Sequence, residues 1–267
     1  MIVHLGQAAD LSDWARHVPS PASRLADAFW PGPLTLALDR HPSVFDAVTG
    51  GQDTVALRMA AHPVAQRLLR VFGGGIAAPS ANLFGRVSPT TAYDVCVALG
   101  GAVDLVVDGG PCEVGVESTF VALEGEEVAI LRPGGVRPEA SAGVLGRRAL
   151  APARRAMRAP GMGASHYTPA TMLELCSSED ASPRAADLVS TGRRVGVLSL
   201  VRIEVPGVAV AWDAGGEMAV FARSLSQRLR QADDEGLDVL VVALPSDGGL
   251  GTAIRDRLRR AAHRPAS

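Results

Sequence analysis

The sequence predicts an α/β protein made of two successive units. Short runs rich in aliphatic and β-branched residues alternate with amphipathic stretches of helical period. The alternation stops at a basic stretch rich in Ala, Pro and Gly and then starts again. The length of 267 residues suits one large domain or two modest ones and allows a sizeable core, so we expect a folded chain.

The first unit, residues 1–148, is expected to form a largely parallel or mixed sheet. Short apolar runs bounded by turn residues predict its strands at 2–5, 34–38, 54–58, 75–78, 104–107, 118–123 and 128–131. Helical periodicity predicts its helices at 22–30, 63–72, 91–99 and 138–146. The third helix has a clear start and stop, because Pro89 and Thr90 precede a periodic run that ends at Gly100 and Gly101.

Periodicity fails next, and residues 149–169 are interpreted as a linker. Residues 147–169 contain no acidic residue and carry five arginines, which are Arg147, Arg148, Arg154, Arg155 and Arg158. Two interpretations carry equal weight: the segment lies over an anionic ligand, or it is a solvated connector.

The second unit, residues 170–267, is expected to be a smaller α/β domain with a core of its own. Its predicted strands are 171–175, 194–200, 208–212 and 239–243. Its predicted helices are 184–191, 218–232 and 252–262. The last helix carries Arg255, Arg257, Arg259 and Arg260, which we interpret as a solvated face.

Composition excludes several classes of protein. The net charge of −2 argues against a domain that holds nucleic acid by overall charge. The chain has no lysine, which excludes Schiff-base chemistry and a Walker-type phosphate loop. Cys96, Cys112 and Cys176 fit neither a disulfide framework nor a paired-cysteine zinc site, and no leader or membrane segment is evident, so we expect a cytoplasmic protein.

Residues 73–94 (GGGIAAPSANLFGRVSPTTAYD) are the densest group of informative residues. A short apolar strand ends at Pro79-Ser80-Ala81-Asn82, and a loop through Ser88 then leads into a helix. Such a strand–loop–helix crevice can surround phosphate with backbone N–H groups and small hydroxyls. Taken alone, these residue types favour an ordinary turn.

Arginines at strand ends strengthen the case for an anion site. Arg58 and Arg132 each end a predicted strand before a turn, and Ser118 and Thr119 follow the glycine turn at Gly115. A guanidinium in such a position can clamp a carboxylate or phosphate through two parallel hydrogen bonds. We therefore expect these strand ends to converge on an anion.

Several motifs in order resemble the Sua5/YrdC/YciO family. They are FWPGPLT at 29–35, APSAN at 78–82, EST at 117–119 and LRPG at 131–134, with PGMGASHYTP at 160–169 and GLGTAIRDRLRRAA at 249–262 resembling the linker and carboxy-terminal domain of Sua5-type members. The resemblance spans essentially the whole chain. It implies a twisted mixed-sheet YrdC-like domain followed by a smaller Rossmann-like α/β domain.

Family members are threonylcarbamoyl-AMP synthases, so the resemblance implies a nucleotidyltransferase that uses L-threonine, bicarbonate and ATP. The product would serve a downstream tRNA threonylcarbamoyl transferase complex in forming t6A37. Positioning and charge neutralisation can supply most of the acceleration of such a step, so we assign no general base. Mg²⁺ is expected with the nucleotide, held mainly by pyrophosphate oxygens rather than by protein ligands.

The resemblance also implies binding roles for ten residues. The threonine-contacting positions are His4, Arg58, Ala78 and Ser118. The ATP-contacting positions are Thr54, Ser80, Asn82, Ser88, Arg132 and Tyr167, of which Asn82 is included because it lies next to the others.

One departure stands out: relatives have a lysine–arginine–proline motif before the stretch that resembles Ile2-Val3-His4, and here Met1 precedes it directly. In relatives, the preceding segment that contains this motif carries two cationic groups for ATP and a hydroxyl for threonine, and charge-assisted contacts to phosphate contribute strongly. Either the start lies upstream or the chain is a shortened variant, and we expect impaired activity of the chain as given.

Two rival functions stay open. One is a non-catalytic RNA-binding module, suggested by the basic linker, and the other is a carbamoyl-transfer domain of the type found in hydrogenase maturation factors. For some residues we favour a structural role over a functional one: Trp30 as a core anchor, His62 as a helix-start residue, His166 as a linker residue and Asp108 as a turn cap. Oligomeric state and direct tRNA binding are left open.

Overall fold

The computed structural model describes residues 1–146 and 167–263. These residues form two compact units, one of residues 1–79 and 117–146 and the other of residues 80–116 and 167–263. The predicted linker, 149–169, lies almost wholly outside the described residues, and the predicted boundary at 148 stays a prediction. In the part that is described, no helix is long and apolar enough to cross a membrane.

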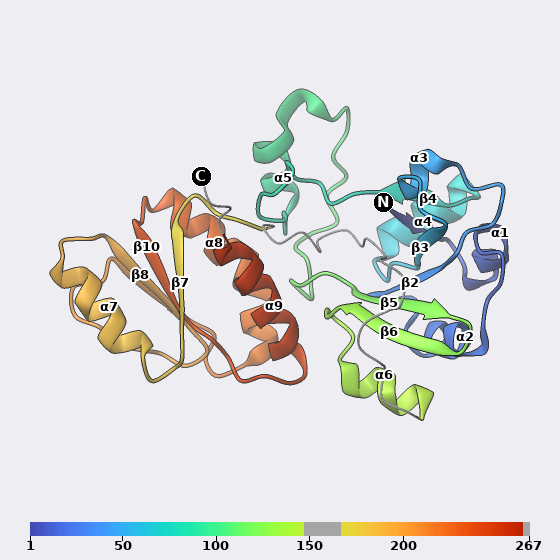
Figure 1. The fold of residues 1–267 in the computed structure, drawn as a ribbon. Coiled ribbons are helices and arrows are strands. Elements are labelled where there is room, and N and C mark those ends of the chain that lie inside the picture. Colours follow the sequence, from blue (N-terminus) through green and yellow to red (C-terminus); the bar gives the residue numbers. More distant parts are fainter. Residues whose placement is uncertain (147–166, 264–267) are drawn as a thin grey trace. The chain divides into compact units, whose positions relative to one another are not determined.

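The first unit contains a six-stranded mixed sheet with the strand order β4-β1-β3-β2-β5-β6 (Figure 1). Neighbours β1/β3 and β2/β5 are parallel, and the other neighbours are antiparallel. The strands are β1 (Ile2–His4), β2 (Leu34–Asp39), β3 (Thr54–Arg58), β4 (Ile76–Ala78), β5 (Thr119–Glu124) and β6 (Glu127–Arg132). The helices are η1 (Ala8–Asp10), α1 (Leu11–Trp14), α2 (Ser20–Phe29), α3 (Asp46–Thr49), α4 (Pro63–Phe72) and α6 (Pro138–Leu145).

The core of this unit lies on one face of the sheet. Successive strand residues point to opposite faces, and Val3, Leu36, Leu57 and Val121 all point to the same one, where each is fully buried. Side chains from α1, α2 and α6 complete this core. The opposite face therefore carries the alternate residues of the same strands.

Helix α4 begins and ends at residues that are typical of helix termini. His62 caps it by accepting a hydrogen bond from the Val64 N–H at 3.3 Å, Pro63 is its first residue, and Gly73 ends it with φ +73°. The predictions for this helix and for His62 as its start residue are confirmed. The short helices α1 and α3 went unpredicted, because four residues are too few to show a period.

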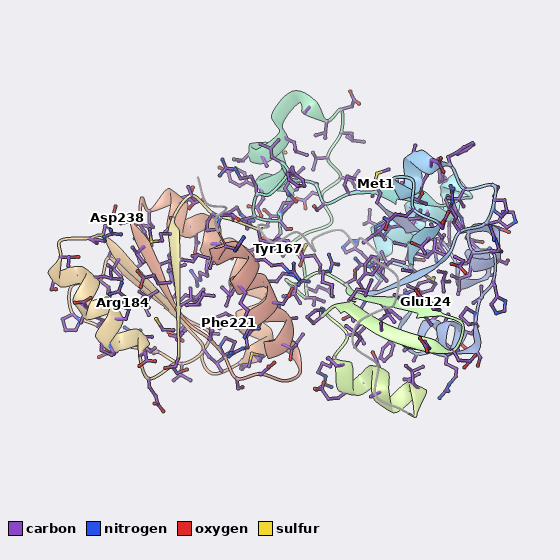
Figure 2. The ribbon with its side chains drawn as sticks, viewed as in Figure 1. Met1, Glu124, Tyr167, Arg184, Phe221 and Asp238 are labelled. Atoms are coloured by element: carbon purple, nitrogen blue, oxygen red, sulfur yellow. The ribbon has the colours of Figure 1, made fainter. Side chains whose placement is uncertain are left out.

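The second unit is built on a four-stranded, wholly parallel sheet in the order β7-β10-β8-β9. Its elements are α5 (Ala92–Leu99), η2 (Gly100–Ala102), β7 (Met172–Cys176), α7 (Ala181–Ser190), β8 (Val195–Ser199), β9 (Val210–Asp213), α8 (Met218–Asp234), β10 (Val239–Ala243) and α9 (Leu250–Ala262). Helices α8 and α9 pack on one face of this sheet, and α7 packs on the other. Phe221 of α8 is fully buried in the larger core (Figure 2). The predicted Rossmann-like second domain is confirmed.

Two predictions were wrong. Residues 104–107 form no strand: Leu105 and Val107 are 78% and 62% exposed, and no described strand pairs with this run. An apolar run becomes a strand only where a neighbour satisfies its backbone. The arginines of α9 are not a uniformly solvated face either, because Arg257 is buried and its guanidinium lies 5.4 Å from the centre of the Tyr167 ring.

Candidate functional site

The face of the first sheet opposite its core carries the site residues predicted for that unit. In β3, Val55 and Leu57 point into the core, so Thr54, Ala56 and Arg58 point to this second face. The register pairs His4 with Arg58, and it pairs Ile2 with both Ala56 and Ala78. His4 and Ala78 therefore share the face with Thr54 and Arg58.

A small apolar cluster forms the middle of this face. Ala37 and Phe120 are buried there, and Ile2, Ala56 and Leu131 pack against them. The site residues of β1, β3 and β4 are only partly buried. The face thus combines a small apolar patch with accessible polar groups, a lining typical of small-molecule sites.

Four of the predicted residues gather at one edge of the sheet. His4, Arg58 and Arg132 end β1, β3 and β6, and Ser118 immediately precedes β5. The strand directions bring these ends to the same edge. Thr54 lies at the other end of β3, paired with Asp39, and Ala78 pairs with Ile2 rather than with His4.

His4 and Arg58 form the first part of this edge. The Arg58 Nε–H donates to the carbonyl oxygen of Gly32 at 3.2 Å. Burial, with the nearby Arg58 charge as a second cause, lowers the pKa of His4 to about 4. His4 is therefore a neutral imidazole at neutral pH beside a permanent cation, a pair suited to a carboxylate ligand.

Ser118 and Arg132 form the second part. The Arg132 Nη2–H group donates to the Ser118 carbonyl oxygen at 2.9 Å and lies 3.3 Å from its Oγ. The Ser118 Oγ also lies 2.7 Å from the Oγ1 of Thr35. Thr35 is a buried hydroxyl that sequence reasoning missed, although its place in an otherwise apolar strand was a signal.

Gly134 permits this arrangement. A Cβ at this position would lie 2.2 Å from the Glu117 carbonyl oxygen and 2.5 Å from the Thr119 nitrogen. The backbone after β6 therefore passes directly against the backbone that leads into β5, where the Gly135 N–H donates to the Glu117 carbonyl at 3.0 Å. This close approach sets the position of Ser118 next to Arg132.

The other four predicted residues belong to the second unit. The predicted strand–loop–helix order is confirmed, since β4 is followed by a loop that leads into α5. Ser80 is exposed and Ser88 is partly buried. Asn82 shapes the loop, because its Nδ2 donates to the carbonyls of Leu83 at 2.8 Å and Arg86 at 3.3 Å.

Tyr167 is buried and has a φ of +65°, which non-glycine residues seldom adopt. Such backbone outliers are found disproportionately at ligand sites. The next residue ties this segment to the loop, because the Thr168 N–H donates to the Gly85 carbonyl at 2.9 Å. His166 lies outside the described residues.

The described residues offer no cluster of three or more His, Cys, Asp or Glu side chains that could hold a metal ion. What the first unit offers instead is two guanidinium groups, a neutral imidazole and a hydroxyl at one sheet edge. These groups can bind anionic substrates and stabilise developing negative charge.

Comparison with known proteins places the chain in a class. A model of the Sua5/YciO/YrdC type, described as "Telomere recombination", matches residues 1–134, and a model described as "Threonylcarbamoyl-AMP synthase, C-terminal domain" matches residues 126–263. The class is thus a YrdC-type domain joined to a Sua5-type carboxy-terminal domain.

Relatives agree over nearly the whole chain. The threonylcarbamoyl-AMP synthases of Pyrococcus abyssi and Bacillus subtilis are 36% and 37% identical to it, with matches that cover 98% of this chain and 79% of each relative. The crystal structure of P. abyssi Sua5 complexed with L-threonine superposes with a TM-score of 0.89 at 35% identity, covering 98% of this chain and 79% of that one. The chain belongs to the Sua5 family.

Proposed function

We propose that the chain is an L-threonylcarbamoyladenylate synthase, which forms threonylcarbamoyl-AMP and pyrophosphate from L-threonine, bicarbonate and ATP. The observation that carries this proposal is 36% identity to a threonylcarbamoyl-AMP synthase across 98% of the chain. The arginine-lined edge of the first sheet supports it independently, because the amino acid carries an anionic carboxylate and the nucleotide carries anionic phosphates.

The proposed threonine contacts are His4, Arg58, Ala78 and Ser118. The Arg58 guanidinium binds the carboxylate, and the neutral His4 imidazole beside it donates or accepts a hydrogen bond without adding charge. The Ser118 hydroxyl bonds the amino acid at the same edge. The small Ala78 side chain leaves room on the shared face.

The proposed ATP contacts are Thr54, Ser80, Asn82, Ser88, Arg132 and Tyr167. Arg132 supplies charge, and the hydroxyls of Thr54, Ser80 and Ser88 bond phosphate or ribose oxygens. Tyr167, whose ring is buried beside Arg257, is proposed on the family resemblance alone. The Asn82 Oδ1 supports its inclusion, since it is buried without a hydrogen-bond partner among the described residues and can accept one from a ligand.

The chemistry needs two bond-forming steps. The threonine nitrogen adds to the carbon of bicarbonate, and loss of water leaves a carbamate. A carbamate oxygen then attacks the α-phosphorus of ATP, and the bond to the pyrophosphate oxygen breaks. Arg58 holds the threonine and Arg132 stabilises the negative charge that develops on the phosphate oxygens. No residue is assigned as a general base.

Mg²⁺ is proposed as the companion of the nucleotide, held by its phosphate oxygens, because the described residues offer no protein cage for it. The ion would neutralise charge on the pyrophosphate. The product is a reactive mixed anhydride, and we propose that a tRNA threonylcarbamoyl transferase consumes it to form t6A37.

The test of this function is an assay of pyrophosphate release in which threonine, bicarbonate and ATP are each omitted in turn, and each omission should abolish release. Mass spectrometry should detect the adenylate product when all three are present. Arg58→Ala should raise KM for threonine about tenfold or more, the value of one charge-assisted contact. Arg67→Ala on the exposed surface of α4 is the matched control and should change nothing. Pyrophosphate release that is independent of threonine and bicarbonate would contradict the proposal, and salt-sensitive tRNA binding without ATP binding would favour the RNA-binding alternative.

A further inference from the structure

Helix α8 holds the segment 80–116 within the second unit. Arg223 and Arg230 are seven residues apart, so both lie on one face of the helix. The Arg223 Nε–H donates to the Glu113 carbonyl oxygen at 2.9 Å, and the Arg230 Nη1–H donates to the Ser88 carbonyl oxygen at 2.6 Å. Helix α8 is thus hydrogen-bonded to the segment near both of its ends.

Apolar packing and a close backbone approach also hold segment 80–116 against α8. Val87 and Val116 belong to the same buried core as Phe221 and Leu225 of α8. A Cβ on Gly115 would lie 2.2 Å from the Arg223 Cα, so the segment passes directly against the helix backbone. Such contacts leave little freedom for the segment to slide along the helix.

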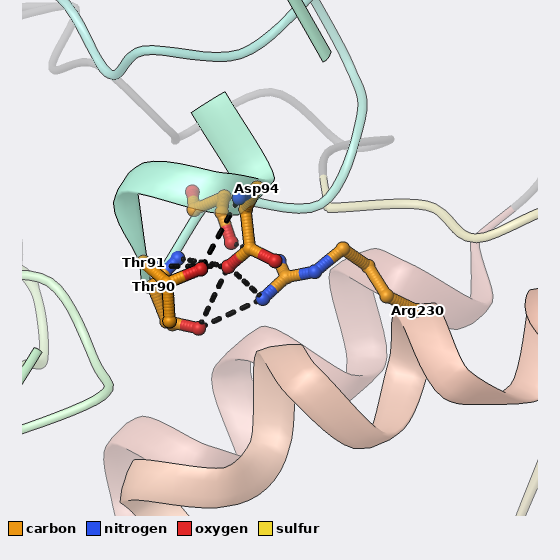
Figure 3. Close-up of polar contacts among 5 residues, drawn as sticks. Thr90, Thr91, Asp94 and Arg230 are labelled. Atoms are coloured by element: carbon orange, nitrogen blue, oxygen red, sulfur yellow. Dashed lines mark hydrogen bonds and ion pairs between the residues drawn. The ribbon is translucent and has the colours of Figure 1, made fainter. Parts of the chain in front are cut away.

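Arg230 is the centre of a polar network (Figure 3). Its Nη2 donates to the Asp94 Oδ2 at 2.6 Å and to the Thr90 Oγ1 at 2.8 Å. The same Asp94 oxygen accepts the backbone N–H groups of Thr90 at 2.8 Å and Thr91 at 2.9 Å. The Thr91 Oγ1 in turn accepts the Asp94 N–H at 3.1 Å, which completes a capping box at the start of α5.

The charges in this network are well matched. Burial acts to raise the pKa of Asp94. The Thr90 backbone hydrogen bond and the Arg230 charge together lower it by more than burial raises it, so the net shift of the pKa is downward. The carboxylate stays ionised and paired with Arg230. A charged pair with satisfied hydrogen bonds fixes geometry well, because removal of either partner leaves the other charge uncompensated.

We propose that Arg230 is a positioning residue for ATP binding: from α8 it holds the backbone of residues 88–94, and with it the Ser88 hydroxyl, in the conformation that receives the nucleotide. This inference rests on the proposed function, since Ser88 is a proposed ATP contact. It assigns the carboxy-terminal domain a direct part in shaping the nucleotide site. In this role Arg230 acts through its contacts with Ser88, Thr90 and Asp94 rather than as an ATP contact.

The test combines hydrogen exchange of the unliganded protein with substrate affinities. In Arg230→Ala we expect the amides of residues 88–95 to exchange about tenfold faster, while those of β10 in the same unit are unchanged. The KM for ATP should rise about tenfold, the equivalent of one charge-assisted hydrogen bond. The Kd for threonine, measured without ATP, should stay within about twofold.

Two further variants sharpen the result. Arg230→Lys keeps the charge but loses the two-pronged geometry, so both effects should be smaller than in the alanine variant. Arg228→Ala is the matched control, because Arg228 lies on the same helix but contacts Trp212 and Gln231 rather than the segment. It should alter neither the exchange at 88–95 nor the KM for ATP.

Unchanged exchange at 88–95 in Arg230→Ala would overturn the inference. So would faster exchange with an unchanged KM for ATP, and so would an equal loss of ATP and threonine binding, which indicates general destabilisation. A wild-type chain that binds no ATP would overturn the proposed function and the role of Arg230 with it, and the exchange data would then show separately whether the network exists in solution.

Discussion

Gly134→Ala should disturb the candidate site through sterics alone. Gly134 does not have a left-handed backbone conformation, so alanine is not excluded by its dihedral angles. The obstacle is the Cβ, which would lie 2.2 Å from the Glu117 carbonyl oxygen and 2.5 Å from the Ser118 carbonyl carbon. Both are backbone atoms, which cannot swing aside as a side chain does.

The size of the effect follows from this distance. Real Cβ contacts are not closer than 3.0 Å, so the two backbone segments must separate by about 1 Å. Overpacking of this kind costs about 1–3 kcal/mol of unfolding free energy. Because Ser118 moves with its backbone, and misplacement of a binding group by about 1 Å can cost about a hundredfold in rate, kcat/KM for threonine should fall by up to that factor.

Urea unfolding and pyrophosphate release measure the two effects. The control is Gly143→Ala in α6, where a Cβ meets no atom within 4 Å and alanine favours the helix by about 0.5–1 kcal/mol. The control should be as active as the wild type and slightly more stable. A Gly134→Ala protein with wild-type stability and wild-type kcat/KM would refute the close backbone approach.

Three further predictions concern the same edge. Because the pKa of His4 is lowered to about 4 in the folded protein, the unfolded chain binds more protons between pH 6.5 and 4. The free energy of unfolding should therefore fall by about 2 kcal/mol from pH 7 to pH 4.5 on this account. In His4→Gln, urea unfolding at the two pH values should show that this part of the pH dependence is lost. Arg132→Lys keeps the charge but not the fork, so we expect a loss of about 1–3 kcal/mol in thermal or urea unfolding and a higher KM for ATP, whereas an unchanged KM would remove Arg132 from the ATP contacts. Ser118→Ala removes the hydroxyl next to both Thr35 and Arg132, and steady-state kinetics should show a raised KM for threonine with little change in KM for ATP; the reverse pattern would exchange the proposed roles of the two halves of this edge.

Local patterns predicted most of the secondary structure. The alternation in residues 54–58 correctly indicated a strand with one buried face, and the Pro and Gly signals around 63–72 matched both ends of α4. The run 104–107 shows the limit of this reasoning. Its residues are as apolar as those of a strand, but pairing depends on a distant neighbour that the local pattern does not reveal.

The polar contacts of the site were harder to predict for the same reason. Thr35 meets Ser118 across 83 positions of the sequence, and Arg230 meets Asp94 across 136. Nothing in the composition of α8 distinguishes Arg230 from its other arginines. Family motifs identified the sheet-edge residues, but the network that holds the loop became evident only from the fold.

The split of the second unit in sequence has a consequence for synthesis on the ribosome. Ser88 leaves the ribosome 142 residues before Arg230. At about 5–20 residues per second, the intervening chain takes roughly 7–28 s to translate. During that interval Val87 and Val116 have no α8 to pack against. Until α8 has been made, the nascent chain is therefore expected to expose these apolar side chains, which favours binding by chaperones.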